Sequence, residues 1–233
     1  MKLDILVFAA HPDDAELACS GTILKHISLG YKVGIVDLTR GELGSRGSAE
    51  IRETEAKKSS NILGLTSRDN LDLGDGFFEI DHTSLVALLK KIRQYKPDIV
   101  FCNAPTDRHP DHGRASKLAS RACFLSGLLK IDTNQEVWRP RAVYHYIQDR
   151  YIKPDFSVDI TEFWDKKLES IDAFSSQFFD PNSDEPETPI SAASFMSYIE
   201  GRAKQFGREI NAEYAEGFIV ERVIGVDDIL ALR

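Results

Sequence analysis

Apolar runs alternate with amphipathic stretches along the first 130 residues of this chain. Leu3 to Ala9 is almost continuously apolar, and the pattern returns at Val33 to Leu38 and at Asp98 to Asn103. Runs of this kind are typical of parallel strands that are covered on both faces. Apolar side chains at helical spacing follow the runs, in residues 14–29, 49–63, 85–95 and 113–129. The alternation predicts an α/β fold, a single Rossmann-like domain whose mostly parallel, twisted sheet has helices on both faces.

The C-terminal part of the chain is less regular. Further strands are expected at residues 70–73, 142–147, 156–160 and 217–223, and further helices at residues 161–174 and 191–212. Three glycines predict a loop within residues 39–48, and three prolines with four acidic residues predict another at 179–189, a candidate mobile lid. Because no repeat or linker interrupts the pattern, we expect one domain over residues 1–233.

Charge and composition narrow the classes of function. A net charge of −8 argues against nucleic acid and anionic membranes as partners, because the chain would meet phosphates with net repulsion. The three cysteines form no CxxC pair, so neither a thiolate zinc site nor a disulfide framework is indicated. No stretch approaches the roughly 18 apolar residues of a membrane-spanning helix. We therefore expect a cytoplasmic protein without membrane insertion.

Two short clusters of imidazole and carboxylate groups each come after an apolar run. Residues 10–16 (AHPDDAE) follow the first run, and residues 108–112 (RHPDH) come soon after the run that ends at Asn103. In an open α/β sheet, ligands bind outside the carboxyl ends of the strands. Two clusters at such ends converge on one metal ion without any unusual topology.

The clusters contain a plausible set of metal ligands. His11, Asp14 and His112 would supply two imidazoles and one carboxylate, which with an open position for water is typical of catalytic zinc. The same ligands accept other divalent ions. The alternative interpretation is that Asp13 or Asp14 merely caps the following helix. Two clusters at corresponding positions favour the metal site.

The other polar residues of the clusters suit hydrolysis of an amide or ester. Asp13 is a candidate to accept a proton from the attacking water, and His109 to polarise a carbonyl or protonate a leaving group. Asp111 is expected to pair with His109 and keep it cationic, because a nearby negative charge raises the pKa of an imidazole. A competing hypothesis is a non-hydrolytic nucleotide-binding domain, but the glycine fingerprint of such domains is missing after the first run.

At this point the chain resembles a known family, the PIG-L (LmbE-like) zinc de-N-acetylases. The resemblance is carried by AHPDDAE at 10–16 and HPDH at 109–112, and it extends to TRGELG at 39–44, RETEA at 52–56 and YAEGF at 214–218. The fuller set is most similar to the bacterial branch that removes acetate from N-acetylglucosaminyl malate in bacillithiol biosynthesis.

The resemblance implies roles for individual residues. Within the two motifs, it implies that His11, Asp14 and His112 bind zinc and that Asp13 is the general base. It also implies that His109 is the general acid, with Asp111 as its partner. It also implies that Arg52 and Asp75 contact the sugar. The family's tyrosine near the tetrahedral intermediate is replaced here by Phe195, with Tyr198 nearby, so the oxyanion partner beyond zinc and His109 stays open.

The implied substrate is a small N-acetylated sugar conjugate, and the implied assembly is a homo-oligomer built from dimers, up to a hexamer. Other acetylated sugars or thiol conjugates stay open as substrates, such as diacetylchitobiose, a mycothiol-type precursor or a mercapturate-type compound. Arg108 is a candidate for binding carboxylates of the substrate because arginine forms bidentate pairs. Arg40, Arg46 and Arg141 share that chemistry, with surface ion pairs as the alternative.

Overall fold

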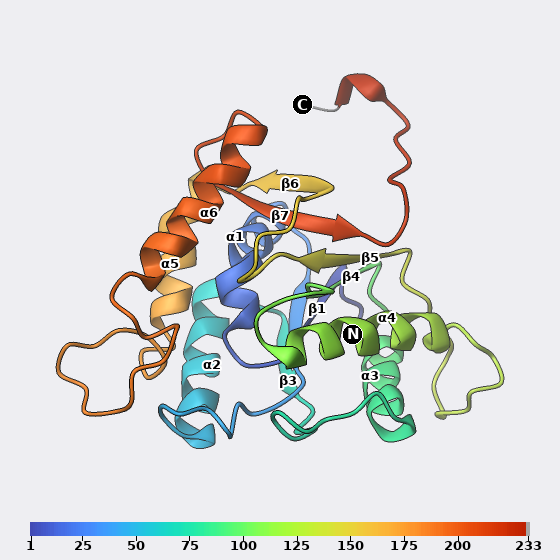
Figure 1. Ribbon diagram of the computed structural model, residues 1–233. Coiled ribbons are helices and arrows are strands. Elements are labelled where there is room, and N and C mark those ends of the chain that lie inside the picture. Colours follow the sequence, from blue (N-terminus) through green and yellow to red (C-terminus); the bar gives the residue numbers. More distant parts are fainter. Residues whose placement is uncertain (232–233) are drawn as a thin grey trace.

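The computed structural model describes residues 1–231, which contain one seven-stranded sheet with the order β3-β2-β1-β4-β5-β7-β6 (Figure 1). The strands are β1 (Ile5–Ala9), β2 (Val33–Asp37), β3 (Ser67–Asn70), β4 (Ile99–Asn103), β5 (Ala142–Tyr146), β6 (Phe156–Asp159) and β7 (Ala215–Val220). Neighbouring strands from β3 to β5 are parallel, whereas β7 runs antiparallel to both β5 and β6. The predicted α/β fold with a mostly parallel sheet is therefore confirmed.

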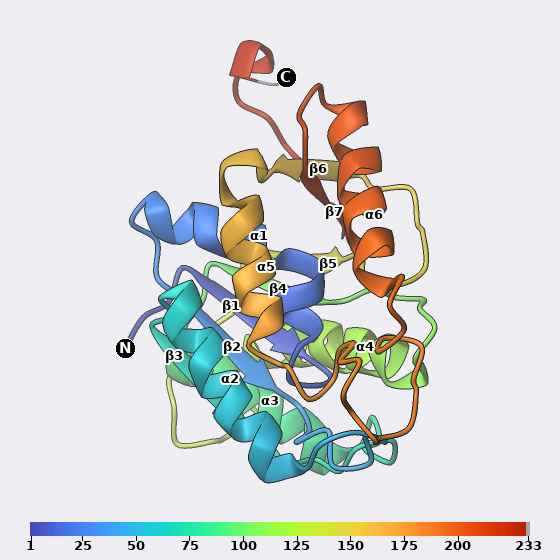
Figure 2. The ribbon, with the colours of Figure 1, turned by 90° about the vertical axis from the view of Figure 1, so that its left-hand side faces the viewer.

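Helices cover both faces of the sheet (Figures 1 and 2). They are α1 (Asp14–Ser28), α2 (Ala49–Leu63), α3 (His82–Tyr95), α4 (Pro110–Ser126), α5 (Trp164–Asp172) and α6 (Phe195–Glu209), with short 3-10 turns at Thr161–Phe163 and Ile229–Ala231. On one face α3 packs beside α4, and on the other α5 packs against α1 and α2. At the far edge, α6 packs against β7.

Strand β1 shows why the sequence forms a buried central strand. Its five residues are all buried, with side chains that alternate between the two faces. Leu6 and Phe8 belong to the core under α3 and α4, while Ile5, Val7 and Ala9 belong to the core under α1. A strand covered on both faces needs apolar residues at every position, which is the continuous run seen in the sequence.

The strand order reverses beside β1. The chain passes from β1 to β2 and β3 on one side and then returns to place β4 on the other, with Ile5 opposite Ile99 and Val7 opposite Phe101. Such a switch point leaves a crevice between the loops that follow the two central strands. Those are the loops that contain the two clusters.

Several element boundaries differ from those expected. The strand expected at 70–73 lies at Ser67–Asn70, and Leu71 and Leu73 continue beside β2 through hydrogen bonds to the carbonyls of Asp37 and Leu38, both 2.9 Å. Helix α4 begins at Pro110 rather than at 113, because His109 caps it. Helices α5 and α6 are shorter than the expected 161–174 and 191–212.

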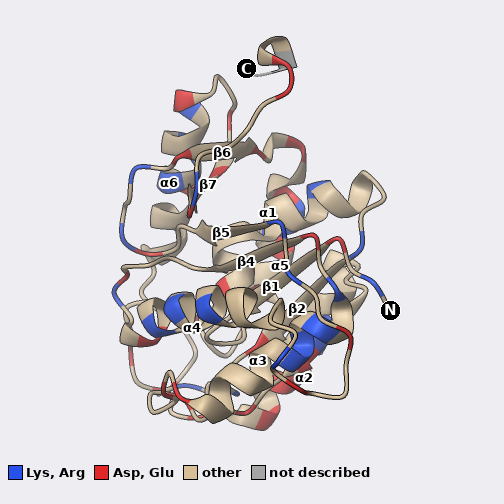
Figure 3. Cartoon of the chain, turned by 90° about the vertical axis from the view of Figure 1, so that its right-hand side faces the viewer, with Lys and Arg blue, Asp and Glu red and all other residues tan. Residues whose placement is uncertain are grey.

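Charge is unevenly distributed over the surface. Helix α4 contains several basic residues, among them Arg114, Lys117 and Arg121, and Figure 3 shows blue segments along this helix. The chain as a whole is nevertheless acidic. No helix within residues 1–231 combines the length and the apolar character needed to cross a bilayer.

Candidate active site

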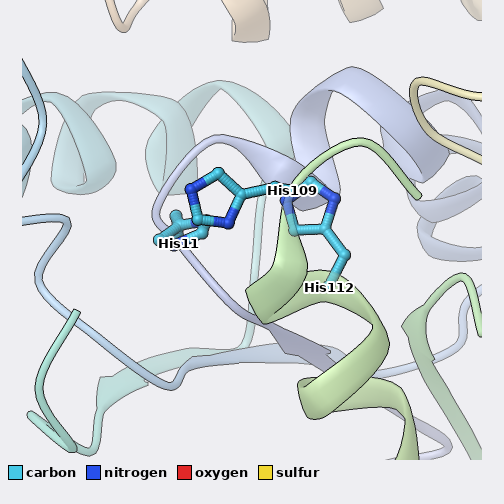
Figure 4. Close-up of side chains that lie close together, drawn as sticks. All are labelled: His11, His109 and His112. Carbon is cyan, nitrogen blue, oxygen red and sulfur yellow. The ribbon is translucent and has the colours of Figure 1, made fainter. Parts of the chain in front are cut away.

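The loops after β1 and β4 bring three imidazoles together (Figure 4). The ring centroids of His11 and His109 are 4.6 Å apart, those of His109 and His112 are 5.3 Å apart, and those of His11 and His112 are 5.6 Å apart. His11 comes from the loop after β1, His109 caps α4, and His112 lies in the first turn of α4. Convergence follows from the parallel pairing of β1 with β4, which puts both carboxyl ends at the same edge.

Asp14 lies between two of the imidazoles. Its Oδ1 is 3.2 Å from Nε2 of His112, and its Oδ2 is 3.5 Å from Nδ1 of His11. The same carboxylate accepts hydrogen bonds from the His11 backbone N–H (3.0 Å), from Asn103 Nδ2 (3.0 Å) and from Gln148 Nε2 (2.7 Å). Burial alone would raise the pKa of Asp14, but His112 and His11 hold it well below its usual range.

A carboxylate supports the far side of His112. Its Nδ1 is 2.8 Å from Oδ2 of Asp107, whose Oδ1 accepts the backbone N–H of Arg150 at 2.8 Å. Burial lowers the pKa of His112, yet Asp14 and Asp107 outweigh that effect and raise it to about 9. This leaves Nε2 facing Asp14. A carboxylate behind a histidine is the usual way to orient a metal-binding imidazole.

His11 has the same arrangement with two carboxylates. Its Nε2 is 3.0 Å from Oδ1 of Asp75 and 3.4 Å from Oδ2 of Asp111. Asp75 also accepts the backbone N–H of Leu43 at 3.0 Å. Burial opposes the protonated ring, but the surrounding carboxylates raise the pKa of His11 well above its usual value. Asp75, for which a sugar contact was expected, is thus a hydrogen-bonding partner of His11.

Asp111 does not make the contact expected of it. Instead of pairing with His109, its carboxylate lies beside His11, accepts the Gly76 backbone N–H at 2.9 Å and is 2.8 Å from Nη1 of Arg114. The pKa of His109 is lowered by burial and by the charges of His11 and His112, in contrast to the cationic ring that was expected. The reason is that α4 starts at Pro110, so the Asp111 side chain points to the β3–α3 connection.

His109 is oriented by the backbone of its own helix. Its Nδ1 accepts the backbone N–H of Asp111 at 3.3 Å, so that nitrogen carries no proton in the neutral ring. The proton of a neutral His109 then sits on Nε2. The residue is half-buried, and its ring adjoins His11 and His112. A neutral imidazole held in this tautomer is a hydrogen-bond donor from Nε2.

Asp13 occupies a strained backbone position beside Arg52. Its φ of 119° lies in the region that favours glycine, and its side chain makes no capping hydrogen bond to α1. Strain of this kind costs on the order of 1–3 kcal/mol and persists where the surroundings enforce it. Instead, Oδ2 accepts a hydrogen bond from Arg52 Nη2 at 2.9 Å. Burial raises the pKa of Asp13 to about 7, against the opposing effect of Arg52.

Arg52 is committed to the protein itself. Besides Asp13, its guanidinium donates to the carbonyls of Pro12 and Gly41, and the side chain is 5% exposed. Its Nε has no hydrogen-bond partner among the described residues. The structure shows that Arg52 holds Asp13, a role that the sequence did not indicate. The contact of Arg52 with sugar hydroxyls stays a prediction.

The donor set fits a divalent cation. His11 Nδ1 and His112 Nε2 both face the Asp14 carboxylate, while further carboxylates lie behind the two rings. Within the described residues, two groups have nitrogen or oxygen atoms that all lie within 4.8 Å of one another, namely His11 with His109 and His112, and His11 with Asp75 and Asp111. The predicted set of His11, Asp14 and His112 is not one of these two groups. The raised pKa values of His11 and His112 favour protonated rings beside these buried carboxylates. A divalent ion can replace those protons, because metal binding releases protons from its ligands.

Other candidates lie outside the cluster. Glu16, in the first turn of α1, is fully buried and binds Ser59 and Arg68, each at 2.6 Å. Arg46 binds backbone carbonyls of Ser176 and Pro186, at 3.0 and 3.2 Å, and thereby holds the loop that was considered as a lid. Arg108 is partly exposed beside the cluster and forms an ion pair with Asp149.

Three residues of the site were missed from the sequence, namely Asn103, Asp107 and Gln148. Asn103 and Gln148 come at or just after the carboxyl ends of β4 and β5, which is the position that predicted the two clusters. Their position, as polar residues at the ends of buried strands, is the sequence signal that could have identified them as residues of the site. Asp107 stands five residues before His112, directly before the second cluster.

Comparison with known proteins bears on the geometry above. Residues 6–123 match the model of the family PIG-L, described as GlcNAc-PI de-N-acetylase. The chain belongs to the PIG-L family. It is similar over 97% of its length to 98% of the conserved protein TT1542 from Thermus thermophilus, with 35% sequence identity and a TM-score of 0.87.

Curated relatives of this PIG-L chain have more than one activity. A diacetylchitobiose deacetylase of Thermococcus kodakarensis is 29% identical over 91% of this chain and 81% of the relative. A probable N-acetyl-α-D-glucosaminyl L-malate deacetylase 2 of Bacillus anthracis is 27% identical over 75% and 81%. A 4-oxalmesaconate hydratase of Pseudomonas putida is 28% identical over 74% and 73%.

Proposed function

We propose that this protein is a zinc-dependent N-deacetylase that removes the acetyl group from an N-acetylglucosamine conjugate, with N-acetylglucosaminyl malate as its substrate. The observation that carries the proposal is the buried cluster in which two imidazoles, of His11 and His112, face the Asp14 carboxylate, while the preceding residue in the chain, Asp13, is hydrogen-bonded to Arg52. Two deacetylases among the relatives support the reaction.

The metal would be held by His11, Asp14 and His112. A divalent ion bound there supplies Lewis-acid activation of the acetamide carbonyl and of water. Asp107 orients His112, and Asp75 and Asp111 orient His11, through the nitrogen of each ring that faces away from Asp14. Asn103 and Gln148 hold the Asp14 carboxylate in place.

Asp13 acts as the general base in this proposal. Its carboxylate accepts the proton of the water whose oxygen attacks the acetamide carbon. Arg52 keeps the carboxylate oriented through the 2.9 Å hydrogen bond. When the C–N bond breaks, that proton passes from Asp13 to the departing amine, so acetate and the free amino sugar are the products.

His109 stabilises the charge that develops on the carbonyl oxygen. Since its Nδ1 accepts the backbone N–H of Asp111, its Nε2–H is the group available to donate. Donors positioned before the reaction lower the energy of the transition state, typically by about 3 kcal/mol for one donor. A neutral ring in this tautomer can fill the role, so the role is compatible with the lowered pKa of His109.

The proposal is tested by acetate release from a panel of substrates, with metal content measured on the same sample. The panel is N-acetylglucosaminyl malate, diacetylchitobiose, a mycothiol-type precursor and a mercapturate-type thiol conjugate. We expect the malate conjugate to have the highest kcat/KM. Release from diacetylchitobiose alone would instead assign the activity of the Thermococcus relative. If no compound releases acetate, the deacetylase proposal is wrong, and hydration of 4-oxalmesaconate, the reaction for which the Pseudomonas relative is named, becomes the reaction to assay.

Asp13→Asn tests the role of the base. We expect this variant to retain its metal and to lose turnover by a factor of about 100 or more. Asp165→Asn, at an exposed position of α5, is the matched control and should leave both unchanged. Full turnover in Asp13→Asn would contradict the assignment.

A further inference from the structure

A groove of about 500 Å³ lies between the loop that contains His109 and helix α6. One wall consists of Arg108, Asp149 and Tyr151, and the other includes Tyr198 and Arg202 of α6. Its volume lies within the range of roughly 300–1,000 Å³ that is usual for small-molecule sites. Among its lining residues, the sequence drew attention to Arg108, Phe195 and Tyr198.

The groove shares its wall with the catalytic cluster. Arg108 stands between Asp107, which binds His112, and His109. Asp149 follows Gln148, which binds Asp14, and the backbone N–H of Asp149 donates to Asp107 at 3.3 Å. A molecule whose acetamide reaches the imidazoles therefore has this groove beside it for its remaining part.

Two guanidinium groups and one carboxylate give the groove an excess of positive charge. Arg108 Nε donates to the Asp149 carboxylate, and Arg202 Nη1 donates to the Asp149 carbonyl at 3.3 Å. Each guanidinium uses one N–H group in these hydrogen bonds, and its other N–H groups are available to a ligand. Burial lowers the pKa of Arg202, while Asp149 and Asp107 oppose this effect. An anion bound in the groove would stabilise the buried positive charge further.

Aromatic rings form the rim. Tyr198 is 70% exposed and Tyr151 is 56% exposed, although large aromatic side chains are usually covered. Exposed rings beside a polar groove offer apolar faces to the carbon atoms of a ligand and hydroxyl groups to its polar atoms. The groove is thus suited to a small ligand that is both anionic and partly apolar.

We propose that this groove binds the part of the substrate that is not acetylated, and that it selects a carboxylate-bearing group over a neutral sugar, with Arg202 as the residue that determines this specificity. The inference rests on the deacetylase function proposed above and specifies the substrate class of that site. Arg202 forms a charged hydrogen bond with the ligand carboxylate, and Tyr198 covers the carbon atoms that connect the carboxylate to the sugar.

The first experiment compares kcat/KM for N-acetylglucosaminyl malate with that for methyl N-acetylglucosaminide, its neutral counterpart. We expect the wild type to prefer the malate conjugate, and Arg202→Gln to reduce the ratio of the two kcat/KM values about tenfold, in accord with loss of one charged hydrogen bond. Arg202→Lys should restore part of the preference. Arg208→Gln, at an exposed position farther along α6 and outside the groove, is the matched control.

The second experiment measures binding without turnover, by calorimetric titration of the deacetylated product, glucosaminyl malate. We expect Arg202→Gln to raise its Kd about tenfold and Tyr198→Ala to raise it several-fold, with thermal melting curves like that of the wild type. An unchanged Kd or an unchanged selectivity ratio in Arg202→Gln would overturn the proposal. A wild type that releases acetate from both glycosides without preference would do the same.

The two proposals fail differently. If no N-acetylated sugar releases acetate, the deacetylase function is lost, while binding of glucosaminyl malate that depends on Arg202 would still assign an anionic ligand to the groove. If acetate is released but Arg202→Gln and Arg208→Gln behave alike, the groove assignment is wrong and the deacetylase function stands.

Discussion

The buried pair Lys167–Glu216 ties β7 and α5 to helix α1, and its removal gives a prediction about stability. Glu216 is 4% exposed, and its Oε1 accepts from Lys167 Nζ at 2.8 Å and from the Gly21 backbone N–H at 3.0 Å. Its Oε2 accepts the Thr22 backbone N–H at 2.7 Å. Lys167, which is 2% exposed, also donates to the carbonyl of Leu17 at 3.0 Å.

We expect Glu216→Leu to lower the free energy of unfolding by about 3–5 kcal/mol, the usual cost of leaving one member of a buried ion pair uncompensated. The substitution leaves a buried ammonium without its carboxylate, and two backbone N–H groups of α1 lose an acceptor. A domain is stable by only about 5–15 kcal/mol in total, so the loss is large. Urea unfolding followed by circular dichroism measures it.

The double variant Lys167→Met with Glu216→Leu separates charge from packing. Because well-packed apolar residues replace a buried ion pair at little cost, we expect the double variant to be more stable than Glu216→Leu alone. Glu200→Gln breaks an exposed pair with Lys204 on α6 and should leave the unfolding midpoint unchanged. The reasoning is refuted if Glu216→Leu costs less than about 1 kcal/mol, or if adding Lys167→Met makes it worse.

Three further predictions concern the site and its surroundings. Asp107→Asn removes the carboxylate behind a predicted metal ligand and should weaken metal affinity about 10–100-fold, as measured by titration with a chelator. Gly41→Ala should reduce turnover with unchanged substrate selectivity, since a Cβ there would lie 2.0 Å from the Arg52 guanidinium at a φ of +67°; full activity would contradict the role of Arg52. Although burial alone lowers it, the neighbouring Cys102 and Glu221 raise the pKa of His145 to about 11. Because this folded pKa exceeds the unfolded value of about 6.5, the stabilisation is complete below pH 6.5 and is lost as the pH rises towards 11, by at most about 1.4 kcal/mol per pH unit. Urea unfolding at pH 6 and pH 9 should show this decline in the wild type and not in His145→Gln. The prediction is refuted if the free energy of unfolding changes equally with pH in both proteins.

The strands and helices that were predicted well are those with strong local signals. Strands β1, β2 and β4 are buried on both faces, so burial by itself requires the apolar runs. Helix α2 matches its expected residues 49–63, because Ser48 caps its start and Gly64 ends it in a left-handed conformation with a φ of 72°. Strand β3 was misplaced because this edge strand consists of the polar residues SRDN, which carry no burial signal.

The candidate site was predictable only in part for a similar reason. The proposed ligands lie within two short motifs, each placed by the end of a strand, so local sequence was enough to single them out. Their supporting residues come from distant segments, as with Arg52 beside Asp13 and Gln148 beside Asp14. Asp111 was assigned to His109 on sequence proximity, whereas side-chain direction at the start of α4 places it beside His11.

The sequence by itself determined which residue types could bind a metal and catalyse hydrolysis, because imidazole and carboxylate groups at the ends of buried strands have few other uses. It also determined the α/β class, because burial on both faces requires apolar residues at every position of a strand. Only the tertiary structure decided that β4 returns beside β1, which brings the two clusters together. It also decided which nitrogen of each imidazole faces Asp14, which ring Asp111 accompanies, and that a groove with Arg202 adjoins the site. These features depend on contacts between segments far apart in the chain, and the free energy of such contacts is set by packing rather than by any local pattern.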